Sequence, residues 1–465
     1  MSSMLRRLKA LPADRSGAVA ILLAIAVIPL SIAALGAVDV SRAFSTKTQL
    51  QDALDAATLA GAREPTDDIN EIRRVAKIAF DQNRVNAPFE VTAGPVFNLK
   101  DNNRVVEGDA SATVDTILAH LVLNGQDMRV NAHSEVRRAG ANLEVALVLD
   151  VTGSMNNPPS KMAALKAAAT ELVDIVVADR QTPFFSKIAL VPYSSAVRLG
   201  DKAATVRGDL TNGVARIGDG QGSDKSEYAA RFDKIEFPAL YGSQPRETFH
   251  ATPCVTERTA DKHEYDDVSY RTAFVGRHYA PATRASDCLS AQVMPLTSSK
   301  TALKDSIARL QPQGSTAGHI GLAWGWYMVS PNWADLWTGE GQAKPYNTPD
   351  LVKVVVLMTD GEFNTIYRYG VVAKDSLPGS PRPQINDNSD NGSNRKQALE
   401  LCKNMKKKDV VVYTVGFQLV EPTAIEIMEK CATSGEHAYL PDSGLELREA
   451  FRAIGHDIAR LHISR

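Results

Sequence analysis

Two apolar runs of the sequence lead into an aspartate, and hydroxyl side chains follow the first of them. The stretch LVLDVTGSM, residues 147–155, ends its apolar run at Asp150 and carries Thr152 and Ser154 two and four residues later. A later run, 351–358, leads into Asp360. Carboxylate and hydroxyl oxygens suit hard cations such as Mg²⁺ or Ca²⁺ and do not suit zinc. The pattern predicts a hard-cation site; a buried strand followed by a polar turn is the simpler alternative.

The elements that must position these residues are apolar strands that alternate with helices. The expected strands cover 143–149, 187–193, 351–358 and 410–417, with a short edge strand at 197–199. The expected helices cover 161–178, 299–310, 319–329, 395–408 and 445–462. Such alternation predicts an α/β fold with a parallel sheet covered on both faces. Ligands of open α/β sheets bind outside the carboxyl ends of the strands, so Asp150 and Asp360 are expected to share one ion.

A fifth oxygen ligand is available in the loop Gln313-Gly314-Ser315-Thr316, which opens the helix expected from 319. Mg²⁺ takes about six ligands and keeps several waters. Five protein oxygens, some acting through water, leave one position for a carboxylate from a partner protein.

Three motifs of this region together resemble the metal-ion-dependent adhesion site (MIDAS) of von Willebrand factor type A domains: DVTGSM, the loop GST and the strand end TDG. The resemblance implies a doubly wound, mainly parallel sheet over residues 141–465 and a protein ligand bound through Mg²⁺, Ca²⁺ or Mn²⁺. Its metal ligands are then Asp150, Thr152, Ser154, Thr316 and Asp360. Thr152 stands where the family usually has serine, and it keeps the hydroxyl.

Two long stretches interrupt the alternation of strands and helices. Residues 200–297 hold no long periodic segment, and residues 365–394 are rich in Pro, Ser, Asn, Asp and Gly. Loops of this length are seldom structural connections. Both stretches are therefore expected to be surface insertions in the α/β domain.

The N-terminus carries an uncharged apolar run over residues 16–38, which is long enough to cross a bilayer as a helix. Arg6, Arg7, Lys9 and Arg15 precede it, so the positive-inside rule predicts a cytoplasmic tail over 1–15 and an exported remainder. We expect a transmembrane helix at 16–39. A cleaved signal peptide and a buried helix of a soluble protein are the alternatives.

Residues 40–140 read as a small α+β region. A helix is expected over 40–62, a second over 66–83, and extended segments over 89–99, 103–116 and 127–138. In the first helix, Leu50, Ala53, Leu54, Ala57 and Ala60 share one stripe. That stripe is consistent either with packing on its own domain or with assembly against partner helices.

The segment 15–62, from RSGAVAILL to LAGA, is similar to the opening of TadE/TadG-like proteins of bacterial tight-adherence (Flp) pilus systems. The resemblance implies a single-pass inner-membrane protein with its bulk in the periplasm or cell envelope. Its implied partners are pilus-assembly components or pilin. A cell-surface adhesin unconnected with pili, and a scaffold that partners an ATPase, are alternatives.

The chain has four cysteines and no CxxC pair. An exported protein lies where disulfides persist, and four cysteines allow three connectivities. We favour Cys254–Cys288 and Cys402–Cys431, because each of these pairs stays within one structural unit.

Other functional classes find little support in the composition. The net charge is −2 with interspersed charges, which argues against a nucleic-acid interface. The sequence holds neither a GxSxG elbow nor a metalloprotease HExxH pattern. A non-enzymatic protein is expected.

The charge asymmetry around residues 16–38 predicts the topology of the chain. Alkaline phosphatase fused after Gly140 should be active, because this enzyme folds only outside the cytoplasm and Gly140 is expected to be exported. A cytoplasmic reporter at the same position serves as the control. An inactive phosphatase together with an active cytoplasmic reporter would reverse the topology.

Overall fold

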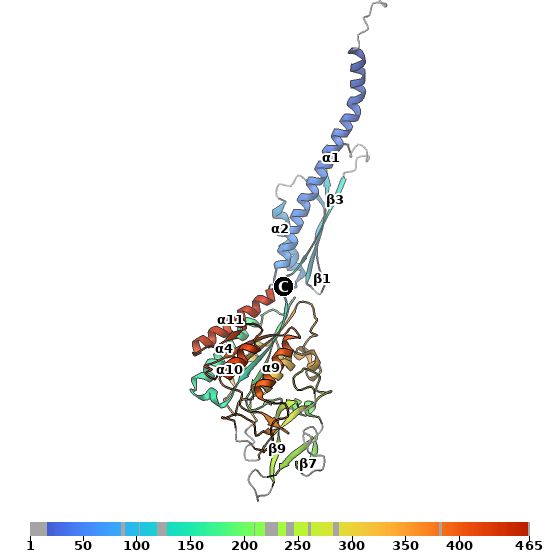
Figure 1. Cartoon of the computed structure of the whole chain (residues 1–465). Coiled ribbons are helices and arrows are strands. Elements are labelled where there is room, and N and C mark those ends of the chain that lie inside the picture. Colours follow the sequence, from blue (N-terminus) through green and yellow to red (C-terminus); the bar gives the residue numbers. More distant parts are fainter. Residues whose placement is uncertain are drawn as a thin grey trace, which may run out of the picture. The chain divides into compact units, whose positions relative to one another are not determined.

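The computed structural model describes residues 16–84, 89–101, 103–118, 128–208, 210–218, 231–238, 246–258, 262–281, 288–380 and 384–463. The chain forms two compact units that divide between Ala139 and Gly140 (Figure 1). The basic tail expected over 1–15 lies outside the described residues, as do parts of the first insertion.

The first unit begins with one continuous helix, α1 (Ser16–Arg63), of 48 residues. Its most apolar stretch has a mean hydropathy of 2.7, and none of that stretch is buried. The helix is therefore long and apolar enough to span a membrane. The helix expected from residue 40 is the direct continuation of the apolar helix.

The second half of α1 packs on a small sheet. The unit also contains α2 (Ile69–Asn83), β1 (Glu90–Lys100), β2 (Val105–Val114) and β3 (Met128–Arg137). The strands form an antiparallel sheet in the order β1-β2-β3. Leu50, Ala53, Leu54 and Ala57 of α1 are buried in one cluster with residues of α2 and this sheet. The apolar stripe of α1 therefore packs on its own unit.

The second unit is built on a six-stranded sheet with the order β11-β5-β4-β12-β15-β16. Its strands are β4 (Asn142–Asp150), β5 (Ser186–Tyr193), β11 (Met294–Thr297), β12 (Leu351–Thr359), β15 (Val411–Gly416) and β16 (Ala438–Tyr439). Neighbours from β5 to β16 pair in parallel, whereas β11 pairs antiparallel with β5. The sheet is thus mixed, with a parallel centre.

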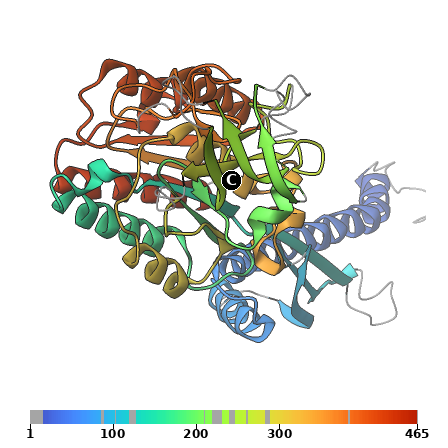
Figure 2. The same cartoon turned by 90° about the horizontal axis from the view of Figure 1, so that it is seen from below.

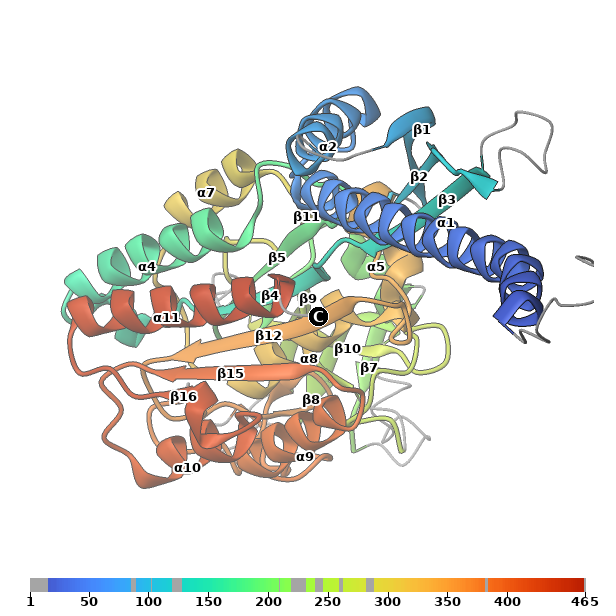
Figure 3. The same cartoon turned by 90° about the horizontal axis from the view of Figure 1, so that it is seen from above.

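Helices cover both faces of this sheet (Figures 2 and 3). They are α4 (Ser160–Val176), α7 (Lys300–Ala308), α8 (Gly318–Val329), α9 (Asn394–Lys406), α10 (Pro422–Cys431) and α11 (Gly444–Ile463). Leu147 and Leu149 of β4 lie in a core cluster with α4, α7 and α11. Ala146 and Val148 lie in the opposite cluster with α8, α9 and α10. Alternate side chains of β4 therefore supply two separate cores.

The first insertion, in which the sequence shows no long periodic segment, contains a second sheet with the order β10-β9-β8-β7, and the expected edge strand β6 just before it pairs with β9 (Figure 1). Its elements are β6 (Val197–Arg198), α5 (Lys202–Arg207), β7 (Thr211–Arg216), β8 (Phe232–Phe237), β9 (Glu247–Arg258) and β10 (Val275–Pro281). Most residues of β7 are exposed. Strands exposed on much of their surface lack the apolar alternation by which strands are recognised in a sequence.

The second insertion packs on the first. It contains a short hairpin of β13 (Tyr367–Arg368) and β14 (Val371–Val372). Tyr369, Val371 and Ile385 share an apolar cluster with Phe237 and Phe249 of the first insertion. The two insertions together form a satellite core beside the central sheet.

Two disulfides join the pairs favoured from the sequence. Cys254 of β9 is bonded to Cys288, and Cys402 of α9 is bonded to Cys431 at the end of α10. The second disulfide links two neighbouring helices on one face of the sheet. The first links β9 to the chain that leads into β11.

The expected α/β class with a long apolar N-terminal helix is confirmed, and the expected strands and helices of the second unit are present. The expectation of a mainly parallel sheet is met in part, because β11 is antiparallel and the second sheet is mixed. Helix α10 and strand β16 were not expected from the sequence.

Candidate metal centre

Strand β4 lies between β12 and β5 in the central sheet, and its pairing with them determines which residues lie next to Asp150. Leu149 pairs with Met358 of β12, so Asp150 lies next to Thr359 and Asp360 at the same edge of the sheet. On the other side, Asp150 pairs with Tyr193 of β5. Asp150 and Asp360, which are 210 residues apart in the sequence (360 − 150), are therefore brought together by strand pairing, as expected.

The Asp150 side chain is fully buried and held by hydrogen bonds. Its Oδ1 accepts the backbone N–H of Thr152 at 2.8 Å. Its Oδ2 accepts the hydroxyl of Thr359 at 2.8 Å and lies 3.2 Å from the hydroxyl of Tyr193. These donors fix the orientation of the carboxylate without providing a positive charge.

The hydroxyls of Thr152 and Ser154 form a chain that ends on the second carboxylate. Thr152 precedes a short 3₁₀ helix, η1 (Gly153–Asn156), which turns the backbone sharply after β4. Thr152 Oγ1 lies 2.8 Å from Ser154 Oγ, and Ser154 donates its hydroxyl to Asp360 Oδ1 at 2.5 Å. Four of the five predicted ligands are thus connected through Asp150, the turn after it and Asp360.

A lysine that sequence reasoning missed also reaches this site. Lys161, in the first turn of α4, donates to Asp360 Oδ2 at 3.0 Å. Its ammonium also lies 5.9 Å from the centre of the Phe417 ring. A cation at the N-terminus of a helix is unfavourable for the helix dipole, and Asp360 offsets that cost. The sequence feature that points to Lys161 is its position at the start of a helix, eleven residues after Asp150.

Thr316 is brought to the site by its loop. The N–H of Gly153 donates to Gly314 O at 2.9 Å, and that of Gln313 donates to Val151 O at 2.7 Å. Gly314 has φ +77°, and a Cβ there would lie 2.8 Å from Ser195 Oγ, so this close approach requires glycine. The backbone N–H and C=O of Thr316 bond to Asn364 and Thr365. These contacts fix its backbone and do not themselves join its hydroxyl to the other four residues.

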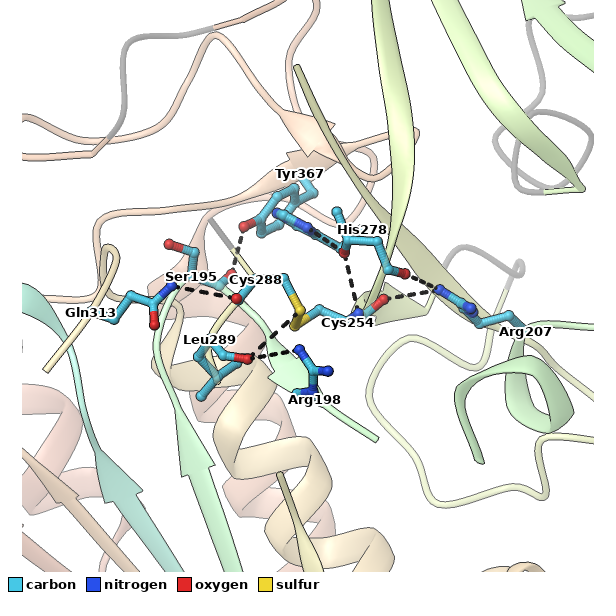
Figure 4. Close-up of a disulfide and its surroundings, with 10 residues drawn as sticks. Ser195, Arg198, Arg207, Cys254, His278, Cys288, Leu289, Gln313 and Tyr367 are labelled. Carbon is cyan, nitrogen blue, oxygen red and sulfur yellow. Dashed lines mark hydrogen bonds between the residues drawn. A yellow bond between two sulfur atoms is a disulfide. The ribbon is translucent and has the colours of Figure 1, made fainter. Parts of the chain in front are cut away.

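The first disulfide lies close behind the same loops (Figure 4). The backbone oxygen of Cys288 accepts from Gln313 Nε2 at 3.4 Å. Tyr367 of the second insertion donates to Ser195 O at 2.5 Å, and Ser195 Oγ accepts the N–H of Ser315 at 2.8 Å. Both insertions therefore contact the loops that surround the candidate ligands.

The site holds two buried carboxylates, and Lys161 is the cation paired with Asp360. Burial and, to a smaller extent, the nearby negative charge of Asp360 raise the pKa of Asp150 to about 7. Hydrogen bonds from Thr152 and Thr359 oppose the shift. A group of this kind is stabilised in its charged form when a cation lies close to it.

The donor set fits a hard divalent cation. Two carboxylates and two hydroxyls converge within hydrogen-bond distances, and they are all oxygens. The supporting roles of Lys161, Tyr193 and Thr359 were not predicted from the sequence. Strand pairing is what brings Tyr193 and Thr359 next to Asp150.

Residues 17–64 match the family described as "Putative Flp pilus-assembly TadE/G-like". The match covers nearly all of α1, including its apolar stretch and the stripe that packs on the first unit. The resemblance of the N-terminal region to TadE/TadG-like proteins is thereby confirmed. No curated protein matches the chain.

Several solved structures are similar to the chain at low sequence identity. The vWF domain of the type V pili tip protein Mfa5 from Porphyromonas gingivalis is 12% identical with a TM-score of 0.38, over 70% of this chain and 97% of that one. The pilus adhesin SpaC from Lactobacillus rhamnosus GG is 13% identical with a TM-score of 0.34, over 80% and 36%. The pilus adhesin RrgA from Streptococcus pneumoniae is 10% identical with a TM-score of 0.36, over 79% and 48%.

The raised pKa of Asp150 predicts how stability depends on pH without divalent ions. An unfolded aspartate ionises near pH 4, whereas folded Asp150 keeps its proton up to about pH 7. In EDTA, Asp150 therefore contributes stability below pH 4 that is lost as the pH rises to about 7, by at most roughly 1.4 kcal/mol per pH unit. Asp150→Asn should lack this contribution.

The measurement is urea unfolding followed by tryptophan fluorescence at pH 5 to 8. All four tryptophans lie between residues 324 and 337, so the signal reports the second unit alone. The difference between the wild type and Asp150→Asn isolates Asp150 from other titrating groups. Parallel pH profiles for the two proteins would contradict the prediction.

Proposed function

We propose that this chain is a membrane-anchored component of a tight-adherence pilus system whose second unit binds a protein ligand through a divalent cation. The observation that carries the proposal is the meeting of Asp150 and Asp360 with the hydroxyl chain of Thr152 and Ser154. The family match over residues 17–64 supports the link to pili.

The second unit is a type A domain in this proposal. A parallel sheet centre with β4 in the middle, helices on both faces, and ligands at the carboxyl ends of β4 and β12 support that assignment. The antiparallel edge strand β11 is compatible with it, since many doubly wound sheets carry such a strand.

The cation would be held by Asp150, Thr152, Ser154, Thr316 and Asp360, and Mg²⁺ is the first candidate, with Ca²⁺ or Mn²⁺ as substitutes. Bound there, the ion supplies the positive charge that two neighbouring carboxylates need and a coordination position for an acidic partner. The residues of the chain orient the site: Thr359 and Tyr193 hold Asp150, and Lys161 holds Asp360.

The proposed location is the inner membrane, with a single span at residues 16–39 and the bulk in the periplasm or cell envelope. The exposed apolar stretch of α1 supports the span. The two disulfides support an oxidising compartment. The proposed partners are pilus-assembly proteins or pilin, and no catalytic activity is proposed.

Metal binding should stabilise the second unit and depend on both aspartates. An ion that binds only the folded state adds about 2.7 kcal/mol at a hundredfold excess over its Kd. Asp150→Ala and Asp360→Ala should abolish the upward shift of Tm on adding Mg²⁺, whereas Thr152→Ser should keep most of it because the hydroxyl remains. The measurement is tryptophan fluorescence of the full chain in detergent, with Mg²⁺ or EDTA.

Asp305→Ala serves as the matched control, since Asp305 is exposed on α7 away from the site. It should leave the metal-dependent shift of Tm unchanged. The cation site is refuted if the wild type and both aspartate variants respond alike to Mg²⁺, Ca²⁺ and Mn²⁺.

The role in assembly makes a separate prediction in cells. Replacing the chromosomal copy with Asp360→Ala should reduce surface pili by up to about tenfold, because a loss of about 1.4 kcal/mol in partner binding weakens the affinity tenfold. Asp305→Ala should leave the pili intact. Electron microscopy counts the pili, and immunoblotting checks that both variants accumulate equally. Normal pili with weakened attachment would instead favour an adhesin.

A further inference from the structure

The end of the apolar run of α1 contacts the segment that follows β2 of the same unit. Both oxygens of Asp39 accept backbone N–H groups from this segment: Oδ1 that of Ile117 at 2.8 Å, and Oδ2 that of Leu118 at 2.7 Å. A Cβ on Gly36 would lie 3.5 Å from Leu118 Cδ2, so Leu118 packs on the helix at that level. Residues 117 and 118 thus lie beside residues 36–39 of α1.

Apolar side chains are exposed around this junction. Val38 is 42% exposed, Val40 53%, Phe44 69% and Ile117 42%. We define these four residues as the apolar collar. The collar continues the exposed apolar surface that begins at Ile21, which is 64% exposed. On the opposite side of the helix, Asp39, Thr46 and Leu50 are buried against the unit.

We propose that the apolar collar is a lipid-contacting surface, so that the chain just after β2 of the first unit enters the outer boundary of the bilayer at Ile117. This proposal rests on the proposed membrane span. About twenty helical residues cross the hydrocarbon core of a bilayer, and the proposed span of residues 16–39 ends next to Val40, so Val38 and Val40 flank its outer end. Phe44 then lies about 6 Å farther along the axis, within the polar headgroup layer.

The position of Ile117 follows from its contacts with the helix. Gly36 lies inside the uncharged run that is proposed to span the membrane. Leu118 packs on Gly36 and therefore lies at the same depth in the membrane. Ile117 is the neighbouring residue and presents its side chain outward. A lipid surface is therefore the occupant that is continuous with the rest of the span.

Asp39 makes this arrangement chemically acceptable. Backbone N–H groups at a membrane boundary that have no partner within a helix or sheet need acceptors, and a carboxylate there needs donors. The two hydrogen bonds from Ile117 and Leu118 to Asp39 satisfy both the N–H groups and the carboxylate. Because Asp39 is only 3% exposed, the first acidic residue after the run does not need to face water.

The test measures the depth of nitroxide spin labels on the full chain in liposomes. All four native cysteines are in disulfides, so a single added cysteine is labelled selectively. Ile117→Cys and Phe44→Cys report the collar. Ile25→Cys is the reference within the span. Leu59→Cys is the reference for water, since Leu59 is an exposed apolar residue about 22 Å beyond Phe44 on the same helix.

The quantity compared is the ratio of collision rates with oxygen, which dissolves in lipid, and with a water-soluble nickel chelate. At 117 and 44 the ratio should be several-fold higher than at 59 and lower than at 25. A ratio at 117 equal to that at 59, with a high ratio at 25, overturns the collar and leaves the span intact. A low ratio at 25 refutes the span itself. A label at 117 shielded from both reagents shows that protein covers the collar and overturns the lipid contact.

Removing the carboxylate tests the role of Asp39. Asp39→Ala should lower the ratio at 117 toward that at 59, because Ile117 and Leu118 lose their acceptor, while the ratio at 44 on the helix should not change. Asp52→Ala, which alters an exposed aspartate of the same helix, should change neither ratio. An unchanged ratio at 117 in folded Asp39→Ala, with helix content checked by circular dichroism, would contradict the proposed clamp.

Discussion

The parallel pairing of β4 with β12 brings two carboxylates together in a buried place, and the residues around them donate hydrogen bonds to both. Asp150 and Asp360 carry like charges at one edge of the sheet, which raises the pKa of Asp150. Thr359, Tyr193 and the turn after β4 donate to Asp150, while Ser154 and Lys161 donate to Asp360. Two neighbouring acids in a buried place lower stability, and this cost supports the proposed metal-binding function of the site.

The insertions extend this site beyond the central sheet. The disulfide between Cys254 and Cys288 lies behind the loop of Gln313, and Tyr367 contacts the loop of Ser195. The satellite core that both insertions share is therefore connected to the candidate ligands through short contacts. A change in the conformation of the loops at the site would therefore alter the contacts that these loops make with the insertions.

The sequence predicted best what local patterns encode. The apolar runs that became β4 and β12 could be read directly, and the order of strands and helices gave the edge where Asp150 and Asp360 meet. Lys161 and Tyr193 could not be assigned, because their contacts depend on strand register and helix packing, which no local pattern reports. The second sheet was not predicted because strands such as β7 lack an alternation of apolar and polar residues. Helix α10 was not predicted because it is short and starts at a proline.

Helix α1 has one further mechanical consequence. Its only proline is Pro29, and the helix runs unbroken from there to Arg63, with Leu50, Ala53, Leu54 and Ala57 locked into the first unit. A continuous helix is stiff along its axis, so its apolar half cannot slide or turn without carrying those side chains with it. A displacement by one residue would move the buried stripe by about 1.5 Å and rotate it by about 100°. A pull on the apolar half of α1 would therefore be transmitted along the helix and would strain the packing of the first unit's core.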